Sequence, residues 1–177
     1  MSKTASPFPE VRRVITGHTA DAQPVLLRDE VTERVFVSPD HLNSVFNIYR
    51  TDQVPANNDG VQGEWKDVIA DKPFGKDTLV SAEGAVVRVF DYAPGATSPM
   101  HRTESLDFGI IHSGTITLTL DDGVTKTLNK GDVIVQRGTI HSWKNESDEW
   151  TRMYWVVVGA KAVEVNGQVL GEQWPKP

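Results

Sequence analysis

The amino-acid sequence predicts an all-β protein, an antiparallel barrel or sandwich. Short runs rich in β-branched residues recur from Val11 to Val169, turn residues separate them, and helical periodicity is nearly absent. The chain has 177 residues, a length that fits one domain with peripheral additions.

The first 80 residues hold strand-like runs that are less regular than the later ones. These runs are Arg12–Ile15, Val25–Arg28, Arg34–Val37 and Val45–Arg50. The polar stretch Thr51–Lys76 follows them and is rich in Pro, Asn, Asp and Gly, so we expect a long loop. Loops of this length in compact domains are usually functional or mobile, and whether this one closes over a site is left open.

The clearest strand is Thr115–Leu120, where Ile and Leu alternate with Thr, so that one face meets the core and the other meets water. Asp121-Asp122-Gly123 ends this strand and predicts a tight hairpin. The other strands expected here are Ala85–Tyr92, Leu106–Ser113, Thr125–Leu128, Asp132–Arg137, Thr139–Trp143 and Arg152–Val158. The run Met153–Val158 is apolar on both faces, which favours a central strand or a subunit interface, and we expect a homodimer.

Composition narrows the class of partner. The net charge of −6 disfavours sequence-independent binding to nucleic acid or to an anionic membrane, so a small-molecule substrate or a protein partner is favoured. The chain shows no signal-like apolar segment and no apolar run long enough to span a membrane, and we expect a soluble, cytoplasmic protein. Cysteine is absent, so any metal ion must be held by histidine and carboxylate side chains.

Three histidines lie in the most strand-rich part of the chain, at His101, His112 and His141, and Asp107 lies between the first two. Asp107 and His112 have opposite parity in one strand, so they cannot both point into one site. His101 and His141 each follow a turn and can converge with Asp107. Two imidazoles and one carboxylate with open positions are typical of non-haem Fe(II), and Mn, Ni, Co or Zn can also occupy such a site.

Two segments resemble the sequence motifs of the cupin family. Gly95–Gly114 follows the spacing of the first motif, G-x5-H-x-H-x3,4-E-x6-G, and Gly131–Asn145 resembles the second, G-x5-P-x-G-x2-H-x3-N. Thr103 stands where the first motif has its second histidine, and Asp107 replaces its glutamate. The second motif is one residue shorter before its histidine and has Arg137 in place of proline.

Sequence segments along nearly the whole chain resemble a group of single-domain cupins of fungi and bacteria, often described as oxidoreductases of secondary-metabolite or aromatic pathways. These segments are Arg12–His18, Met100–Asp107 and Gln136–His141. This resemblance implies an antiparallel double-stranded β-helix, the cupin jelly-roll barrel, with extra N-terminal strands. Residues 1–80 would form N-terminal strands and a loop packed on the barrel, 81–168 the barrel and 169–177 a C-terminal tail. It also implies at most three protein ligands, His101, Asp107 and His141, for a divalent metal ion, Fe(II) first.

Residues near the expected ligands are candidates for binding and catalysis. Arg102 and Arg137 flank ligands and suit a substrate carboxylate or enolate, although either can equally be a surface or turn residue. Glu104 is a candidate for moving protons. The residues expected to line an apolar pocket, with core packing as the alternative for the larger ones, are Met100, Thr103, Phe108 and Trp143.

Three functions are consistent with this pattern. The first is a metal-dependent oxidoreductase, such as a dioxygenase, acting on a small oxygen-rich compound that is enolizable, aromatic or polyketide-like. The second is a non-redox decarboxylase, dehydratase or isomerase that uses the metal ion as a Lewis acid. The third is a cupin that binds a ligand without catalysis, because fold does not fix function.

Overall fold

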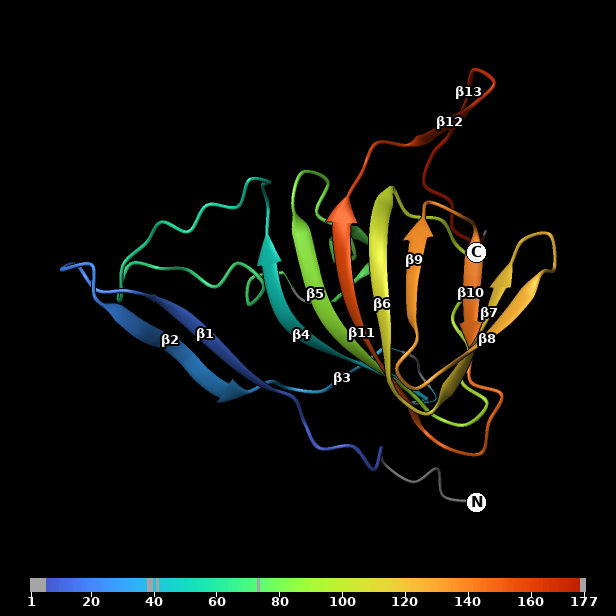
Figure 1. Ribbon diagram of the computed structural model, residues 1–177, viewed down its shortest axis with the longest axis horizontal. Helices are drawn as coiled ribbons and strands as arrows, with labels where there is room; N and C mark the ends of the chain where they lie inside the picture. Colours follow the sequence, from blue (N-terminus) through green and yellow to red (C-terminus); the bar gives the residue numbers. More distant parts are fainter. Residues whose placement is uncertain (1–5, 38–39, 41, 73, 176–177) are drawn as a thin grey trace.

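The computed structural model describes residues 6–37, 40, 42–72 and 74–175, and confirms the predicted antiparallel β-barrel (Figure 1). A six-stranded sheet forms one side, in the order β3 (Val35–Phe36), β4 (Asn43–Thr51), β5 (Ala85–Tyr92), β11 (Thr151–Gly159), β6 (Ser105–Ser113) and β9 (Val133–Arg137). A three-stranded sheet forms the other, in the order β10 (His141–Lys144), β7 (Thr115–Leu120) and β8 (Thr125–Asn129). Helical structure among the described residues is limited to the 3-10 turn η1 (Lys76–Thr78), and no described segment is a helix long and apolar enough to cross a membrane.

Strand alternation decides which side chains face the barrel interior. In β6, Asp107, Gly109 and Ile111 are buried, whereas Phe108, Ile110 and His112 are exposed, as the parity of the strand predicts. The buried apolar side chains from both sheets form one core cluster, made of Tyr92, Ala93, Ala96, Ile111, Ile116, Leu118, Trp143, Met153 and Trp155. β6 therefore turns the carboxylate of Asp107 inward, between neighbours of the same parity that are small or apolar.

The doubly apolar strand lies at the centre of the larger sheet. β11 pairs with β5 along one edge and with β6 along the other, so the expectation of a central position is confirmed. The backbone N–H and C=O groups of β11 can therefore form hydrogen bonds with a neighbouring strand on each side, as buried backbone groups require. The expected homodimer stays a prediction.

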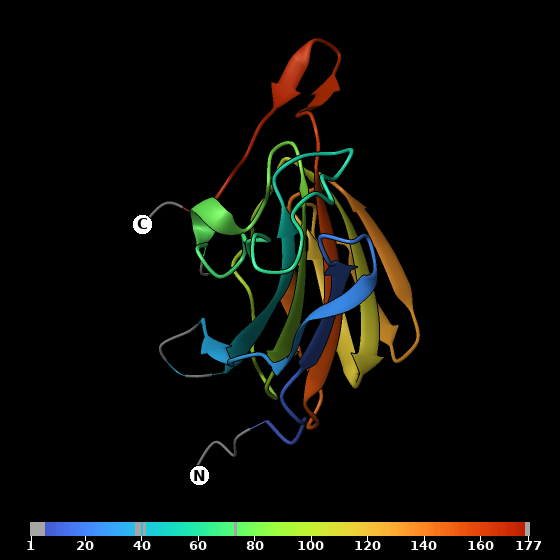
Figure 2. The ribbon, with the colours of Figure 1, turned by 90° about the vertical axis from the view of Figure 1, so that its left-hand side faces the viewer.

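Two hairpins project from the barrel. β1 (Arg12–His18) and β2 (Pro24–Val31) form a ribbon beyond β4, and β12 (Val163–Val165) and β13 (Gln168–Leu170) form a shorter one at the opposite end (Figures 1 and 2). The second hairpin is not among the strands expected from sequence. Its turn, Asn166-Gly167, has positive φ at both residues, and Asn-Gly is a strong hairpin signal. After β13 the chain turns back toward the barrel, which matters for the site below.

A buried ion cluster fastens the N-terminal segment to the outer face of the sheet. The Asp91 carboxylate is fully buried and accepts two hydrogen bonds from Arg152, at 2.6 and 2.8 Å, and one from Arg34 at 2.8 Å. Arg152 also donates to the Pro9 carbonyl oxygen at 2.9 Å, and its guanidinium lies over the Phe8 ring. One carboxylate thus pairs with two arginines from segments far apart in the sequence.

Asp91→Asn should destabilise the fold strongly, because it leaves two guanidinium groups without the carboxylate that they share. Breaking a buried ion pair costs about 3–5 kcal/mol, and urea denaturation followed by circular dichroism measures the loss. Asp29→Asn is the matched control, since its pair with Arg12 is solvent-exposed, and should leave the urea midpoint near that of the wild type. Equal midpoints for both variants would contradict the role given to Asp91.

Candidate active site

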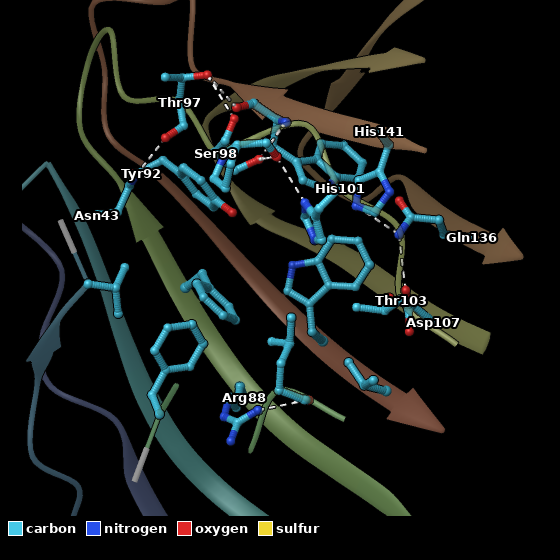
Figure 3. Close-up of a pocket in the computed structure, with 18 of the residues that line it drawn as sticks. Asn43, Arg88, Tyr92, Thr97, Ser98, His101, Thr103, Asp107, Gln136 and His141 are labelled. Atoms are coloured by element: carbon cyan, nitrogen blue, oxygen red, sulfur yellow. Dashed lines mark hydrogen bonds between the residues drawn. The ribbon is translucent and has the colours of Figure 1, made fainter. Parts of the chain in front are cut away.

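A cavity of about 300 Å³ opens between the two sheets (Figure 3). Most of its wall is apolar, and its aromatic members are Phe74, Phe90, Tyr92, Trp143, Trp155 and Trp174. Phe74 comes from the end of the long loop that follows β4, so part of that loop forms wall. One group of polar side chains lies together at one side and consists of His101, Thr103, Asp107, Gln136 and His141. A largely apolar cavity with a few grouped polar side chains is the usual form of a small-molecule site.

The two histidines form a directly opposed cross-strand pair. His101 and His141 exchange both backbone hydrogen bonds, at 2.9 and 3.0 Å, in an isolated antiparallel bridge. Residues opposite each other in an antiparallel pair present their side chains on the same face. The imidazole rings consequently lie with their centroids 4.5 Å apart at the cavity wall (Figure 3).

Each imidazole has its tautomer set by a backbone carbonyl two residues earlier. The Nδ1 atom of His101 lies 2.9 Å from the Pro99 oxygen, and Nδ1 of His141 lies 3.0 Å from the Thr139 oxygen. A carbonyl oxygen only accepts, so Nδ1 carries the proton in both rings and Nε2 keeps a lone pair. Histidines that bind metal ions are usually anchored in this way through the other ring nitrogen.

Asp107 and Gln136 form a second opposed pair, between β6 and β9. The Gln136 amide nitrogen donates to Asp107 Oδ2 at 3.0 Å and to His141 Nε2 at 3.0 Å (Figure 3). The other oxygens of this pair, Asp107 Oδ1 and Gln136 Oε1, are buried and have no hydrogen-bond partner. Such orphaned buried acceptors are rare in native structures and require an explanation, such as a bound cation or ligand.

Burial shifts the pKa of each titratable group in this cluster toward its uncharged form. It raises the pKa of Asp107 to about 6, against the lowering effect of the neighbouring Ser105 hydroxyl and Gln136 amide. Burial, together with the neighbouring His101, lowers the pKa of His141 to about 4, and burial lowers the pKa of His101. Both imidazoles are therefore neutral at physiological pH, the state in which they bind metal ions.

The C-terminal segment completes the cavity wall. Gln173 forms an antiparallel bridge with Arg102, with backbone hydrogen bonds of 2.8 and 3.0 Å. The next residue, Trp174, stacks on the His101 ring, with centroids 4.7 Å apart and planes inclined by 14°. Trp174 lies outside every motif and becomes a site residue only because the chain returns after the β12–β13 hairpin.

Of the residues expected to line an apolar pocket, Thr103 and Trp143 lie in the cavity wall, whereas Met100 and Phe108 do not. Phe108 is 36% exposed on the outer face of β6, because it neighbours Asp107 and strand neighbours face opposite sides. Met100, which precedes His101 and lies in no strand, is also absent from the wall. For Phe108, alternation along β6 explains the outward position.

The charged residues expected to act on substrate also lie elsewhere. Glu104 and Arg137 border a separate, smaller cavity, and Arg102 donates to the Gly171 carbonyl oxygen at 3.4 Å. Arg137 follows Gln136 in β9, so it faces outward where Gln136 faces inward. The same alternation could have identified Gln136, which shares its parity with the inward Ile134.

The donor set suits a divalent ion, although these side chains are not closed around one. Within the described residues, no three side chains of the His, Asp and Glu types are grouped closely enough to hold an ion. The Gln136 amide occupies the position between Asp107 and His141. Two neutral imidazoles with Nε2 lone pairs and one orphaned carboxylate oxygen are nevertheless the donors that first-row divalent ions prefer. The three-ligand set stays a prediction.

Comparisons with known proteins agree with the β-barrel fold and identify proteins of similar sequence. A family model described as "Cupin domain" matches residues 88–157. Oryzines biosynthesis cluster protein J of Aspergillus oryzae is 35% identical over 93% of this chain and 92% of that protein. A cupin-domain-containing oxidoreductase of Hypocrea virens is 34% identical over 90% of this chain and 83% of its own length.

Other similarities are more limited. Phomopsin biosynthesis cluster protein C' of Diaporthe leptostromiformis is 49% identical, but only over 50% of this chain and 47% of that protein, so the matched region spans about half of each. Among solved structures, the cupin domain of Schizosaccharomyces pombe Cnp3 superposes with a TM-score of 0.51 over 85% of this chain and 88% of that chain. At 13% identity, this likeness concerns the fold alone.

The pKa shifts predict opposite pH dependences for two variants of the metal-free protein. Between about pH 4 and 6, folded Asp107 keeps a proton that the unfolded chain has lost, so it favours folding as pH falls. Folded His141 lacks a proton that the unfolded chain carries, so it opposes folding as pH falls. Asp107→Asn should therefore lose stability more steeply on acidification than the wild type, and His141→Gln less steeply, each by up to about 1.4 kcal/mol per pH unit. Urea unfolding at several pH values measures the slopes, and slopes equal to that of the wild type would contradict the shifts.

Trp174→Ala should expose the His101 ring, because it removes the indole stacked on it. Diethyl pyrocarbonate modifies neutral imidazoles, and mass spectrometry of peptides gives the rate at His101. We expect faster modification than in the wild type, whereas Trp65→Ala, outside the cavity wall, should leave the rate unchanged. The same rate in both variants would mean that Trp174 does not cover His101 in solution.

Proposed function

This chain belongs to the cupin family, and on that basis we propose that it is a metal-dependent oxidoreductase acting on a small oxygen-rich organic compound. Relatives aligned along most of the chain are named cupin-domain-containing oxidoreductases. The proposal extends that activity to this protein and assigns it to the cavity between the two sheets.

The observation that carries the proposal is the paired, neutral imidazoles of His101 and His141. Their Nδ1 protons are held by backbone carbonyl groups, which leaves both Nε2 atoms as ligands. Asp107 Oδ1, buried and unpaired, is the third donor, once the Gln136 amide gives up its bond to His141. We propose Fe(II) as the ion, with Mn, Ni, Co or Zn as alternatives, because this donor set accepts all of them.

A divalent ion here would supply an electrophilic centre with open positions and, as iron, one-electron chemistry. The chain's own residues would do the rest. The aromatic wall would hold a flat substrate and exclude water, which strengthens polar interactions at the histidines. The Gln136 amide would hold Asp107 through its hydrogen bond to Oδ2, which leaves Oδ1 as a ligand.

A non-redox reaction is the second candidate, and the raised pKa of Asp107 favours it. A carboxyl group with a pKa of about 6 can accept and return a proton near neutral pH, as decarboxylation, dehydration and isomerisation require. Oxygen separates the two candidates. With Fe(II) and candidate phenols or β-keto acids, an oxidoreductase that uses dioxygen consumes it in step with product. A decarboxylase or dehydratase releases carbon dioxide or water equally well under nitrogen.

His141→Ala and His101→Ala should each abolish stoichiometric binding of Fe(II) or Mn(II), because each removes one of two fixed nitrogen ligands. Binding is measured by metal analysis after anaerobic reconstitution and desalting, and by the rise in melting temperature that the ion causes in the wild type. His112→Ala is the matched control, since this exposed histidine of β6 faces away from the cavity. Full metal retention in His101→Ala and His141→Ala would refute the metal site, and circular dichroism verifies that the variants are folded.

A further inference from the structure

Arg88 is a buried arginine that lines the same cavity at a distance from the histidines. It lies on β5 and is 1% exposed, and its side chain faces inward opposite Trp155 of β11. Its guanidinium donates from Nε to Asn47 Oδ1 at 2.9 Å, from Nη1 to the Leu79 oxygen at 3.0 Å and from Nη2 to the Thr78 oxygen at 2.8 Å. These bonds use three of its five N–H groups, which leaves one on Nη1 and one on Nη2.

Arg88 differs from the other buried arginines in having no counter-ion. Arg152 is paired with Asp91, and Arg50 with Asp52. Within the described residues, no carboxylate forms a salt bridge with Arg88, whose hydrogen-bond partners are all neutral. An isolated cation in low-dielectric surroundings is costly, so a site of this kind favours an anion that enters it.

The electrostatic environment agrees with this description. Burial, together with the positive charge of Arg50, lowers the pKa of Arg88 to about 10. The guanidinium remains charged at neutral pH despite this shift. The Cζ atom of Arg88 lies 5.3 Å from the centroid of the Phe74 ring, so the cation is in contact with the aromatic wall.

The cavity separates Arg88 from the polar cluster by an apolar region. Figure 3 shows Arg88 well apart from His101, Gln136 and Asp107, with other wall side chains drawn between them. Phe90 and Trp155 belong to that wall. Phe90 lies two residues after Arg88 on β5, and Trp155 lies opposite Arg88 on β11. A ligand that fills the cavity therefore meets a cation at one end, aromatic surface in the middle and the histidines at the other end.

We propose that Arg88 binds a carboxylate group of the substrate, and that the substrate is a small aromatic acid whose reacting end lies at His101 and His141. The assignment of this ligand as the substrate rests on the proposed function; the carboxylate site itself does not. Two spare N–H groups on neighbouring nitrogens match the two oxygens of a carboxylate. Arg88 takes the role that the sequence suggested for Arg102 and Arg137, which face away from this cavity.

The test compares two probes of the same shape, 2-naphthoate and 2-naphthamide, in metal-free protein held in chelator at pH 7.5. Binding is measured by calorimetry and by quenching of tryptophan fluorescence, since Trp143, Trp155 and Trp174 line the cavity. Hydrogen bonds to a charged group predict roughly ten- to hundredfold tighter binding of the carboxylate than of the amide. Equal affinities in the wild type would overturn the proposal without any variant.

Arg88→Met should bring the two affinities within about twofold of each other while 2-naphthamide still binds as in the wild type, because the apolar wall is intact. Arg137→Met, outside the cavity, is the control and should keep the full preference. Should Arg88→Met not fold, Arg88→Lys keeps the charge and removes the two-pronged geometry, and a preference undiminished in that variant would count against the proposal.

The histidine variants separate this proposal from the metal centre. His101→Ala and His141→Ala should keep the preference for 2-naphthoate, even though they are expected to lose the ion. A preference that disappears in these variants and survives in Arg88→Met would place the acid at the histidines and overturn the proposal. If the histidine variants lose the metal ion and keep the preference for 2-naphthoate, the ion is assigned to the histidines and the carboxylate to Arg88.

Discussion

The candidate site depends on the register of two antiparallel strand pairs. His101 stands opposite His141, and Asp107 stands opposite Gln136. Opposed residues share a face, and a slip of one residue in either pair would turn two of these side chains out of the barrel. The turn Gly138–Ile140 joins the pairs, because it leads from Gln136 at the end of β9 to His141 at the start of β10. Backbone pairing, more than contact between side chains, positions the four polar groups.

The apolar interior then determines the chemistry of these groups. Burial holds both imidazoles neutral and raises the pKa of the one carboxylate beside them, while carbonyl groups fix which ring nitrogen carries the proton. Arg88 lines the same cavity and forms no salt bridge with a described residue, so the interior combines neutral imidazoles at one end with an unpaired cation at the other. These features come from one property, a barrel lined by aromatic side chains, and together they suit an acidic, flat organic molecule.

The sequence predicts the strands and the convergence of the histidines well, because both depend on local alternation and on spaced motifs. His101, Asp107, Thr103 and Trp143 all reach the cavity. The cavity wall does not include Phe108 or Arg137, because adjacent residues of a strand face opposite sides. It does not include Met100 either, which lies in no strand. Trp174 could not be predicted by such reasoning, because its position depends on a bridge between Gln173 and Arg102, which are far apart in the chain. Arg88 requires knowledge of which arginines find carboxylates, and only the folded structure supplies it.

The central claim is that His101 and His141 together bind a divalent metal ion inside the barrel. Anomalous X-ray diffraction at the iron edge, from crystals grown anaerobically with Fe(II), tests it most directly. The claim predicts one strong anomalous peak within bonding distance of Nε2 of both histidines, with the Gln136 amide displaced from His141. A peak bound to surface carboxylates alone, or no peak at saturating iron, would contradict it.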